Sequence, residues 1–414
     1  MSQLNIGNLL TRQRKFKTWI WHHYYAVIFI AYFLAVFYPG MIRPGVVGTI
    51  LLLIVGYSIF PIRLHSVGLL ILCYFALTWI DVFLTPVAGL PVSVGLREFT
   101  NSSLPVLFYF VGSSSKFNAE RAYSNYLSAL LFAYFVGFIW YLSPPQYYLE
   151  YLYRVYNLGS TGYFLDPRFT SFLSSVEIAP LACVGMLISI HSYLEGGKAR
   201  DLLLTYGSLL VTMLTLQRAA YLMVAAIFLA AALRYYKSRF KRVLILFLPA
   251  MFVVLFLLSN IDSSLFLNMI NKLSRLGSAV AERSSQWSNV TKIGIGILWG
   301  HGLGSMSHKA IGYTDLLIND GGFFKLLGET GLIGFVLLCT GVFLALGSCF
   351  GRKCRTDIFI ERMTIIIFAI DAVGSNTLFF QVCAPVFWLA LGRLALARSS
   401  NIEEGTPSRL SILA

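Results

Sequence analysis

Arg218 is the residue whose chemistry most needs an explanation in this sequence. It lies in the apolar stretch from Leu202 to Leu233, which is too long for one membrane crossing and fits two short ones, since a bilayer core takes about 20 apolar residues per helix. We therefore expect a tight turn with Arg218 at or just beneath the outer surface. A cation costs roughly 2.5–3.5 kcal/mol at the centre of a span and less near an end. Arg218 therefore predicts an anion that binds beside it.

Two long connections, about 144–171 and about 261–325, hold most of the remaining polar chemistry. Both are expected on the outer face, and long connections with helical patterns of their own are usually functional. Arg168 ends a turn in the first connection, beside the next span. In the second, apolar residues repeat at helical spacing over 266–276, which predicts a helix lying along the membrane surface.

A second helical segment of the longer connection carries Arg283 and Trp287. Their four-residue spacing places a cation beside an aromatic wall on one helix face. The run Gly300–Ser305 follows, with the sequence GHGLGS. No Gly-Lys-Ser/Thr follows it, so it is not a Walker loop, but its glycines let the backbone turn sharply and approach a ligand. His301 in this run is a candidate for ligand contact or for a structural role.

The composition is that of a polytopic membrane protein and not of a soluble domain. Of 414 residues, 57% are hydrophobic and 12% are charged. Hydropathy predicts an all-α protein with about twelve transmembrane helices in one integral membrane domain over 1–414. The expected spans are 24–40, 46–62, 67–87, 102–115, 123–143, 172–194, 202–216, 219–233, 243–260, 326–349, 363–378 and 381–397.

The net charge of +14 is explained by sidedness, without nucleic acid as a partner. Most of the 32 basic residues fall on one face, including the clusters 234–242 and 352–362. The positive-inside rule places that face and both termini in the cytoplasm. The first apolar run lacks a cleavage pattern and should remain as an anchor. The six cysteines fall in spans or on the inner face, which predicts no disulfide, and they show no metal-binding spacing with histidine.

Several segments occur in a characteristic order: LTLQRAAYL around Arg218, ERSSQW around Arg283, GHGLGS, and NDGGFFKLLGETGLIG leading into a span. Together with DPRFTSFLSSVEIAP, they make the chain resemble the bacterial O-antigen polymerase and O-antigen ligase superfamily. The resemblance is best over about 160–335, and the amino-terminal third matches only in hydropathy. Ligases usually carry a His-Asn pair where this chain reads Asn319-Asp320, which is nearer the polymerase version.

The resemblance implies a membrane glycosyltransferase with a GT-C-like fold, whose two long loops with short helices lie in the periplasm. It implies the bacterial inner membrane as location, and undecaprenyl-diphosphate-linked oligosaccharides as donor and acceptor. It also implies a separate chain-length regulator as a partner. The reaction would be the polymerisation of repeat units into O-antigen or a related surface polysaccharide.

Such a reaction displaces lipid diphosphate from an anomeric carbon, so fixed guanidinium groups are what the site needs. We assign this role to Arg218 and Arg283, with Arg168 as a third candidate. No Asp-x-Asp pair occurs in the sequence. We therefore expect a metal-independent enzyme without a cofactor.

A general base would take the proton of the attacking hydroxyl. Asp320 is the first candidate, because it lies where the ligases have their histidine, and an Asx turn or helix cap is the alternative. Glu329 comes next, unless it caps a helix or pairs with an arginine. His301 would contact diphosphate or sugar.

Two other functions stay open on the sequence. One is an O-antigen ligase that transfers glycan to lipid A core. The other is a transporter of polysaccharide or lipid-linked oligosaccharide, which Asp81 and Asp371 favour because both are acids in expected spans. Against a transporter, no pair of matched, Gly/Pro-broken spans occurs in two halves of the chain.

Overall fold

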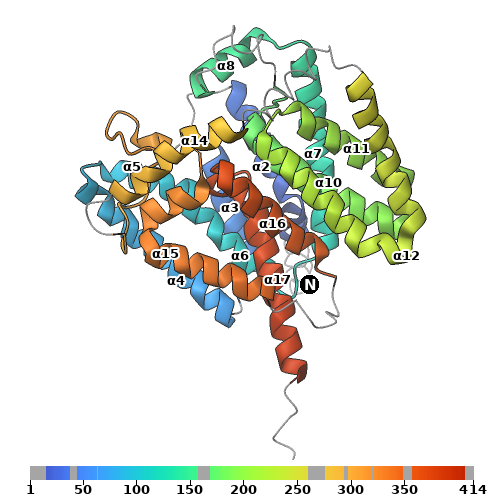
Figure 1. Ribbon diagram of the computed structural model, residues 1–414. Coiled ribbons are helices and arrows are strands. Elements are labelled where there is room, and N and C mark those ends of the chain that lie inside the picture. The colour runs from blue at the N-terminus through green and yellow to red at the C-terminus, as the bar shows by residue number, and fades with distance from the viewer. Residues whose placement is uncertain are drawn as a thin grey trace, which may run out of the picture.

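The computed structural model describes residues 15–37, 44–62, 64–156, 168–259, 276–292, 297–318, 320–347 and 357–405. Nearly all of the amphipathic segment expected over 266–276 lies outside these residues, as does Asn319. Within them the regular elements are helices, without a strand (Figure 1). This follows from the sequence, because lipid-exposed backbone must satisfy its hydrogen bonds within one segment.

The helical elements keep their chain order and the labels of Figure 1. They are α2 (Tyr24–Phe37), α3 (Pro44–Ile59), α4 (Ser66–Leu84), η1 (Thr85–Ala88), α5 (Val92–Glu98), η2 (Phe99–Ser103), η3 (Leu104–Leu107), α6 (Phe108–Gly112), α7 (Ala119–Leu142), α8 (Gln146–Tyr156), α10 (Ser175–Gly196), α11 (Ala199–Leu214), α12 (Arg218–Ser259), α14 (Leu276–Trp287), η4 (Ser288–Lys292), η5 (His308–Ala310), α15 (Gly322–Gly347), α16 (Phe359–Gly374), η6 (Thr377–Phe379) and α17 (Ala384–Gly405).

Five helical segments in the described part are long and apolar enough to cross a membrane. They are Ser66–Ala88, Ala119–Leu142, Ser175–Gly196, Arg218–Leu248 and Gly322–Gly347. The chain is therefore an α-helical membrane protein, and the count of twelve spans stays a prediction. The expected span over 102–115 is built from short π, 3-10 and α segments, since Pro105 and a serine-rich sequence interrupt a regular helix there.

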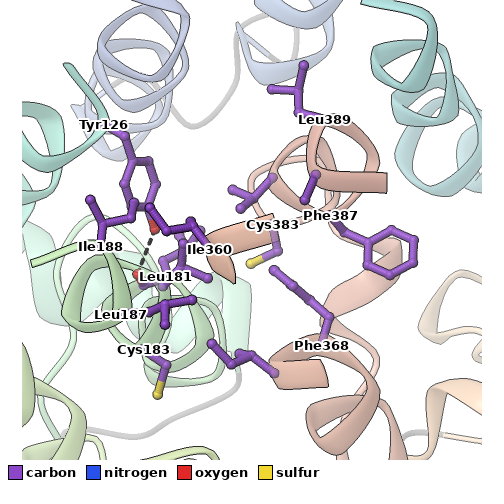
Figure 2. Packing of buried hydrophobic residues seen from close by; sticks show 14 of the residues in the cluster. Tyr126, Leu181, Cys183, Leu187, Ile188, Ile360, Phe368, Cys383, Phe387 and Leu389 are labelled. Atoms are coloured by element: carbon purple, nitrogen blue, oxygen red, sulfur yellow. Dashed lines mark hydrogen bonds between the residues drawn. The ribbon is translucent and has the colours of Figure 1, made fainter. Parts of the chain in front are cut away.

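Helix α10 forms the centre of the bundle. Its side chains are buried along nearly the whole length, and it packs against α7, α11, α12 and α16. Figure 2 shows Leu181 and Leu187 of α10 on one side of this view of the core, and Phe368 of α16 and Phe387 of α17 on the other. The Tyr126 hydroxyl of α7 donates to the Leu181 carbonyl at 2.6 Å, so the buried phenol has its partner. This packing holds the start of α10 and the end of α16 in fixed positions relative to each other.

Helix α12 reverses direction at Arg239, the one residue inside it with non-helical backbone angles. The rings of Phe228 and Phe247 lie 5.3 Å apart, although 19 residues of straight helix would separate them by roughly 28 Å. The Tyr206 hydroxyl of α11 donates to the Leu246 carbonyl at 2.9 Å, which fixes the returning half against α11. The two halves contain residues 219–233 and 243–259, and the separate membrane crossings expected there stay a prediction.

Candidate functional site

Arg218 is the first residue of α12, directly after the tight turn that ends α11. Leu216 in this turn has a positive φ of 54°, a conformation that leucine rarely adopts. The Phe169 amide donates to the Leu214 carbonyl at 2.8 Å, which brings the Arg168 segment to the same turn. Gln217 donates to the Ser175 hydroxyl at 3.2 Å and so joins the turn to the start of α10. Two predicted site residues, Arg168 and Arg218, are thereby brought to one place.

Arg218 has no acidic partner at this turn among the described residues. Arg218 is half-buried and has no ion pair or hydrogen bond to any described residue. Arg168 is also half-buried and acts electrostatically on the Tyr221 hydroxyl, one turn after Arg218. Glu177 at the start of α10 is engaged in a capping box, accepting from the Ser174 amide and hydroxyl at 2.9 Å each. The turn therefore offers a half-buried cation to an anion from outside the protein.

A second group forms where α14 meets the start of α15. Arg283 donates to Asp320 Oδ2 from Nη2 at 2.9 Å and from Nε at 3.2 Å. The Trp287 indole, one turn later, donates to the Asp320 backbone carbonyl at 2.9 Å and stacks on Phe324. Gly321 is required there, because a Cβ would lie 2.5 Å from the indole nitrogen. Arg283 and Trp287 thus share one face of α14, and Asp320 holds the cation.

The end of α16 lies against this second group. A Cβ on Gly374 would lie 3.3 Å from Arg283 Nη1, and the Gly322 amide donates to the Ser375 carbonyl at 2.9 Å. Asp371, one turn inside α16, is buried and accepts hydrogen bonds from the Ser375 and Thr377 hydroxyls. Asp371 looked in the sequence like an isolated acid in a span. The structure gives it two hydroxyl partners and places it near Asp320, with which it interacts electrostatically.

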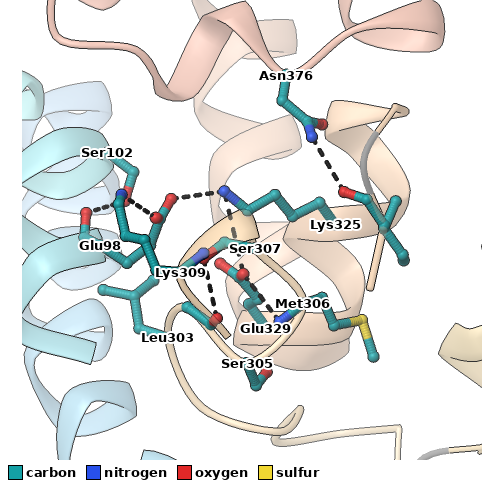
Figure 3. A network of polar contacts seen from close by, with 12 residues as sticks. Glu98, Ser102, Leu303, Ser305, Met306, Ser307, Lys309, Lys325, Glu329 and Asn376 are labelled. Atoms are coloured by element: carbon teal, nitrogen blue, oxygen red, sulfur yellow. Dashed lines mark hydrogen bonds and ion pairs between the residues drawn. The ribbon is translucent and has the colours of Figure 1, made fainter. Parts of the chain in front are cut away.

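Glu329 lies in a buried ion network that also contains Glu98, Lys309 and Lys325 (Figure 3). Glu98 of α5 accepts from Lys309 Nζ and from Lys325 Nζ, each at 2.5 Å. Glu329 Oε1 lies 4.0 Å from Lys325 Nζ and accepts the Met306 amide at 3.3 Å. The network ties the described part of the 261–325 connection, called the outer connection below after its expected side, to α5 and to α15. Its role is therefore structural.

The network also sets the charge of its acids. Burial raises the pKa of Glu98, but the charges of Lys309 and Lys325 and their hydrogen bonds outweigh burial, and the pKa falls to about 2. Glu98 is therefore a carboxylate at any physiological pH. Asp81 of α4 is fully buried nearby, and neither carboxyl oxygen has a hydrogen-bond partner among the described residues.

The start of the glycine run Gly300–Ser305, together with the residues just before it, packs against a break in helix α15. Gly331 has φ 67° and ψ −173°, so the helix is interrupted there, and residues 297–302 bond to the backbone on both sides of the break. The His301 amide donates to the Gly328 carbonyl at 2.8 Å, and the Leu332 amide donates to the Ile297 carbonyl at 2.8 Å. A Cβ on Gly300 would lie 2.5 Å from the Gly331 nitrogen. The glycines make the sharp turns expected of them, but the backbone they approach is the protein's own.

His301 is half-buried, and its Nε2 has no hydrogen-bond partner among the described residues. Burial lowers the pKa of His301, so the ring is uncharged at neutral pH. His301 lies next to the α15 break, whereas Asp320 and Arg283 lie at the start of that helix. None of the contacts made by His301 in the described part of the chain joins it to an arginine.

The six predicted site residues therefore fall into three places. Arg168 and Arg218 lie at the α11–α12 turn, Arg283 and Asp320 at the α14–α15 junction, and Glu329 with His301 beside the α15 break. The first two places are at the same end of the bundle, because Cys383, which follows α16, contacts the Glu177 carbonyl near the start of α10 at 3.5 Å. Sequence reasoning missed Glu98, Lys309 and Lys325, whose pairing joins positions 211 and 227 residues apart.

A cavity of about 590 Å³ opens at the other end of the bundle. Its wall includes Tyr123, His191, Arg200, Glu361 and Arg393, and none of the six predicted site residues lines it. Among the described residues, no group of three His, Cys, Asp or Glu side chains could hold a metal ion. Comparison with protein-family models and with curated proteins finds no match.

Proposed function

We propose that this chain is a membrane glycosyltransferase that polymerises undecaprenyl-diphosphate-linked oligosaccharides into O-antigen or a related surface polysaccharide. The proposal places the reaction on the periplasmic face of the bacterial inner membrane, with both termini in the cytoplasm. The observation that carries it is Arg218, a half-buried guanidinium without an acidic partner among the described residues, at the end of two apolar helices. A diphosphate attached to a lipid reaches such a position from the membrane surface, and a guanidinium binds its oxygens in pairs.

Arg283 supplies the second cation in this proposal. Before the donor binds, its guanidinium is held by Asp320 at 2.9 and 3.2 Å. The incoming diphosphate competes for the same guanidinium, and the Asp320 carboxylate is then free to accept the proton of the acceptor hydroxyl. The hydroxyl oxygen bonds to the anomeric carbon, the bond from that carbon to the diphosphate oxygen breaks, and undecaprenyl diphosphate leaves. Arg168 adds charge at the same end.

Glu329 and His301 receive weaker roles. Glu329 lies 4.0 Å from the buried Lys325 ammonium and accepts a backbone amide, so we assign it to holding the outer connection in place. His301, uncharged at neutral pH, is assigned to contact with the sugar or the diphosphate through its ring nitrogen.

The test is the purified protein in lipid, supplied with a defined undecaprenyl-diphosphate repeat unit alone. We expect a ladder of lipid-linked polymers when the products are resolved by size. Asp320→Ala should bind the donor but form no ladder, whereas Asp315→Ala, at an exposed position of the same outer connection, should behave like the wild type. Transfer that occurs only after lipid A core is added would make the protein an O-antigen ligase, and no transfer in either case would refute the glycosyltransferase proposal.

The second candidate function is a transporter of lipid-linked oligosaccharide, which the cavity at the opposite end favours. A transporter needs polar access from both ends. On α16, Glu361 lines that cavity and Asp371 lies near Arg283, but Phe368 between them is buried and packs against Phe387. The apolar layer separates the two polar ends along α16, which supports the enzyme over the transporter.

A further inference from the structure

The bend of α12 carries a dense set of basic residues. The segment 234–242 reads RYYKSRFKR and contains no acid. Three of its cations are engaged within the protein. Arg234 pairs with Asp357 at 2.6 Å, Arg239 lies 3.7 Å from Glu195, and Arg242 donates to the Leu194 carbonyl at 2.7 Å.

Lys237 and Lys241 are the cations of this bend that remain for an external partner. Both are exposed, and neither forms a hydrogen bond or an ion pair with a described residue. Removal of these two charges would therefore leave the observed contacts of the bend intact.

Exposed side chains along α12 mark the depth of the bend in the membrane. Leu229 and Leu233 are exposed on the half that enters the bend, and Leu244 and Leu248 are exposed on the half that leaves it. Exposed leucines on a membrane-spanning helix face lipid tails. The bend between them is consequently at the edge of the hydrocarbon layer.

Two aromatic residues occupy that edge. Tyr236 and Phe240 are each 56% exposed, and their ring centroids lie 6.3 Å apart in an edge-to-face arrangement. Exposed aromatic rings at the end of a membrane helix lie at the level of lipid headgroups. Lys237 and Lys241, each next in sequence to one of these rings, therefore extend at the level where lipid phosphates lie.

We propose that the α12 bend is a binding site for acidic phospholipids, with Lys237 and Lys241 contacting the phosphate and the aromatic pair resting on the upper acyl chain. The proposal is independent of the reaction proposed above and of which leaflet the bend faces. A lysine near an acidic membrane surface contributes about 1 kcal/mol, which corresponds to a factor of about 5 in lipid affinity. Both lysines together give a factor of about 30.

The experiment measures the thermal unfolding midpoint of the full chain in detergent while lipid is added. Phosphatidylglycerol and phosphatidylcholine are titrated separately, so that charge and acyl chain effects are distinguished. We expect the wild type to be stabilised at lower concentrations of phosphatidylglycerol. The Lys237→Gln/Lys241→Gln variant should need about 30-fold more phosphatidylglycerol for the same stabilisation, with an unchanged response to phosphatidylcholine.

The control is Lys198→Gln/Arg200→Gln, which removes two exposed charges at the same end of the bundle, without an exposed aromatic pair beside them. It should keep the wild-type response. An equal loss in the control, or a wild-type response in the Lys237→Gln/Lys241→Gln variant, would overturn the proposal. Stabilisation of the wild type by inorganic phosphate at the same concentrations would show an ion site in place of a lipid site, and would also overturn it.

Discussion

Glu98→Gln should loosen the outer connection from the membrane bundle, since this carboxylate of α5 holds Lys309 of that connection and Lys325 of α15. Glu98 is 2% exposed, and both Lys309 and Lys325 lie 2.5 Å from its oxygens. Removal of one member of a buried ion pair costs about 3–5 kcal/mol, because the partner charge stays buried. Lys325 keeps Glu329 at 4.0 Å, so we take the lower end, about 3 kcal/mol.

The loss can be measured locally and globally. Trypsin cleaves after Lys309 only when that segment opens, and an opening free energy lowered by about 3 kcal/mol makes the open form about 150-fold more populated. Cleavage between 309 and 310 should accelerate by that factor. The unfolding midpoint in detergent should fall by about 6 °C, at about 2 °C per kcal/mol for a chain of this size.

A matched control is Glu195→Gln, which removes an acid from an exposed pair with Arg239 at 3.7 Å. An exposed pair contributes about 0–1 kcal/mol, so this variant should stay close to the wild type. If Glu98→Gln is cleaved after Lys309 no faster than Glu195→Gln, the ion network does not hold the connection. Glu98→Gln/Lys309→Gln, which no longer has the trypsin site, should recover part of the loss in unfolding midpoint, because one uncompensated charge has been removed.

Four further outcomes are expected. Arg218→Lys should lose at least about ten-fold in polymer formation, because an ammonium cannot bind two phosphate oxygens as a guanidinium does, and Arg200→Lys should not. Gly331→Ala should lower the unfolding midpoint, since its Cβ would lie 2.2 Å from a carbonyl oxygen. The Cβ of Gly347→Ala meets no atom within 4 Å, so that variant should be neutral or stabilising. The pKa of Glu98 is depressed to about 2 from 4.5. Its stabilisation of the folded state should therefore be complete above pH 4.5 and lost as the pH falls toward 2, which unfolding measured at a series of pH values will check. EDTA should leave polymer formation by the purified protein unchanged, and loss of activity that magnesium restores would contradict the metal-free mechanism.

The parts of the structure that were predictable are those with a local pattern. Long apolar runs indicated helices, because a backbone in lipid has no other way to satisfy its polar groups. The turn at Arg218 followed from the length of one such run. Arg283 and Trp287 were expected on one helix face from their spacing, and both contact Asp320.

The unpredictable parts are contacts between distant segments. Nothing near Glu98 in the sequence indicates that it meets Lys309 and Lys325, since each partner lies more than 200 residues away. Glu329 was expected to be the second candidate base, or to cap a helix or pair with an arginine, and the structure places it beside Lys325. Its surroundings become apparent only when α5, α15 and the outer connection pack together.

The fold of α12 is a further feature that the sequence predicted only in part. Hydropathy indicated two spans with a basic connection, and the structure instead keeps helical hydrogen bonding almost through the bend, with one non-helical residue at Arg239. A basic connection of nine residues has room for a loop or for a tight helical reversal. Packing of Phe228 on Phe247 selects the reversal, and such a ring contact has no signature in the local sequence.

The break in α15 at Gly331 has a consequence for how this protein can diversify. Because residues 297–302 complete the hydrogen bonding of a membrane helix, an insertion or deletion within them would expose backbone groups to an apolar surrounding, at several kcal/mol each. By contrast, Ile311, Gly312 and Tyr313 are exposed, and a Cβ at Gly312 meets no atom within 4 Å. Changes of length and of surface chemistry should accumulate around 311–313 among related chains, while 297–302 keeps its length. One short stretch of the outer connection is then free to vary, while another is inherited with the helix it completes.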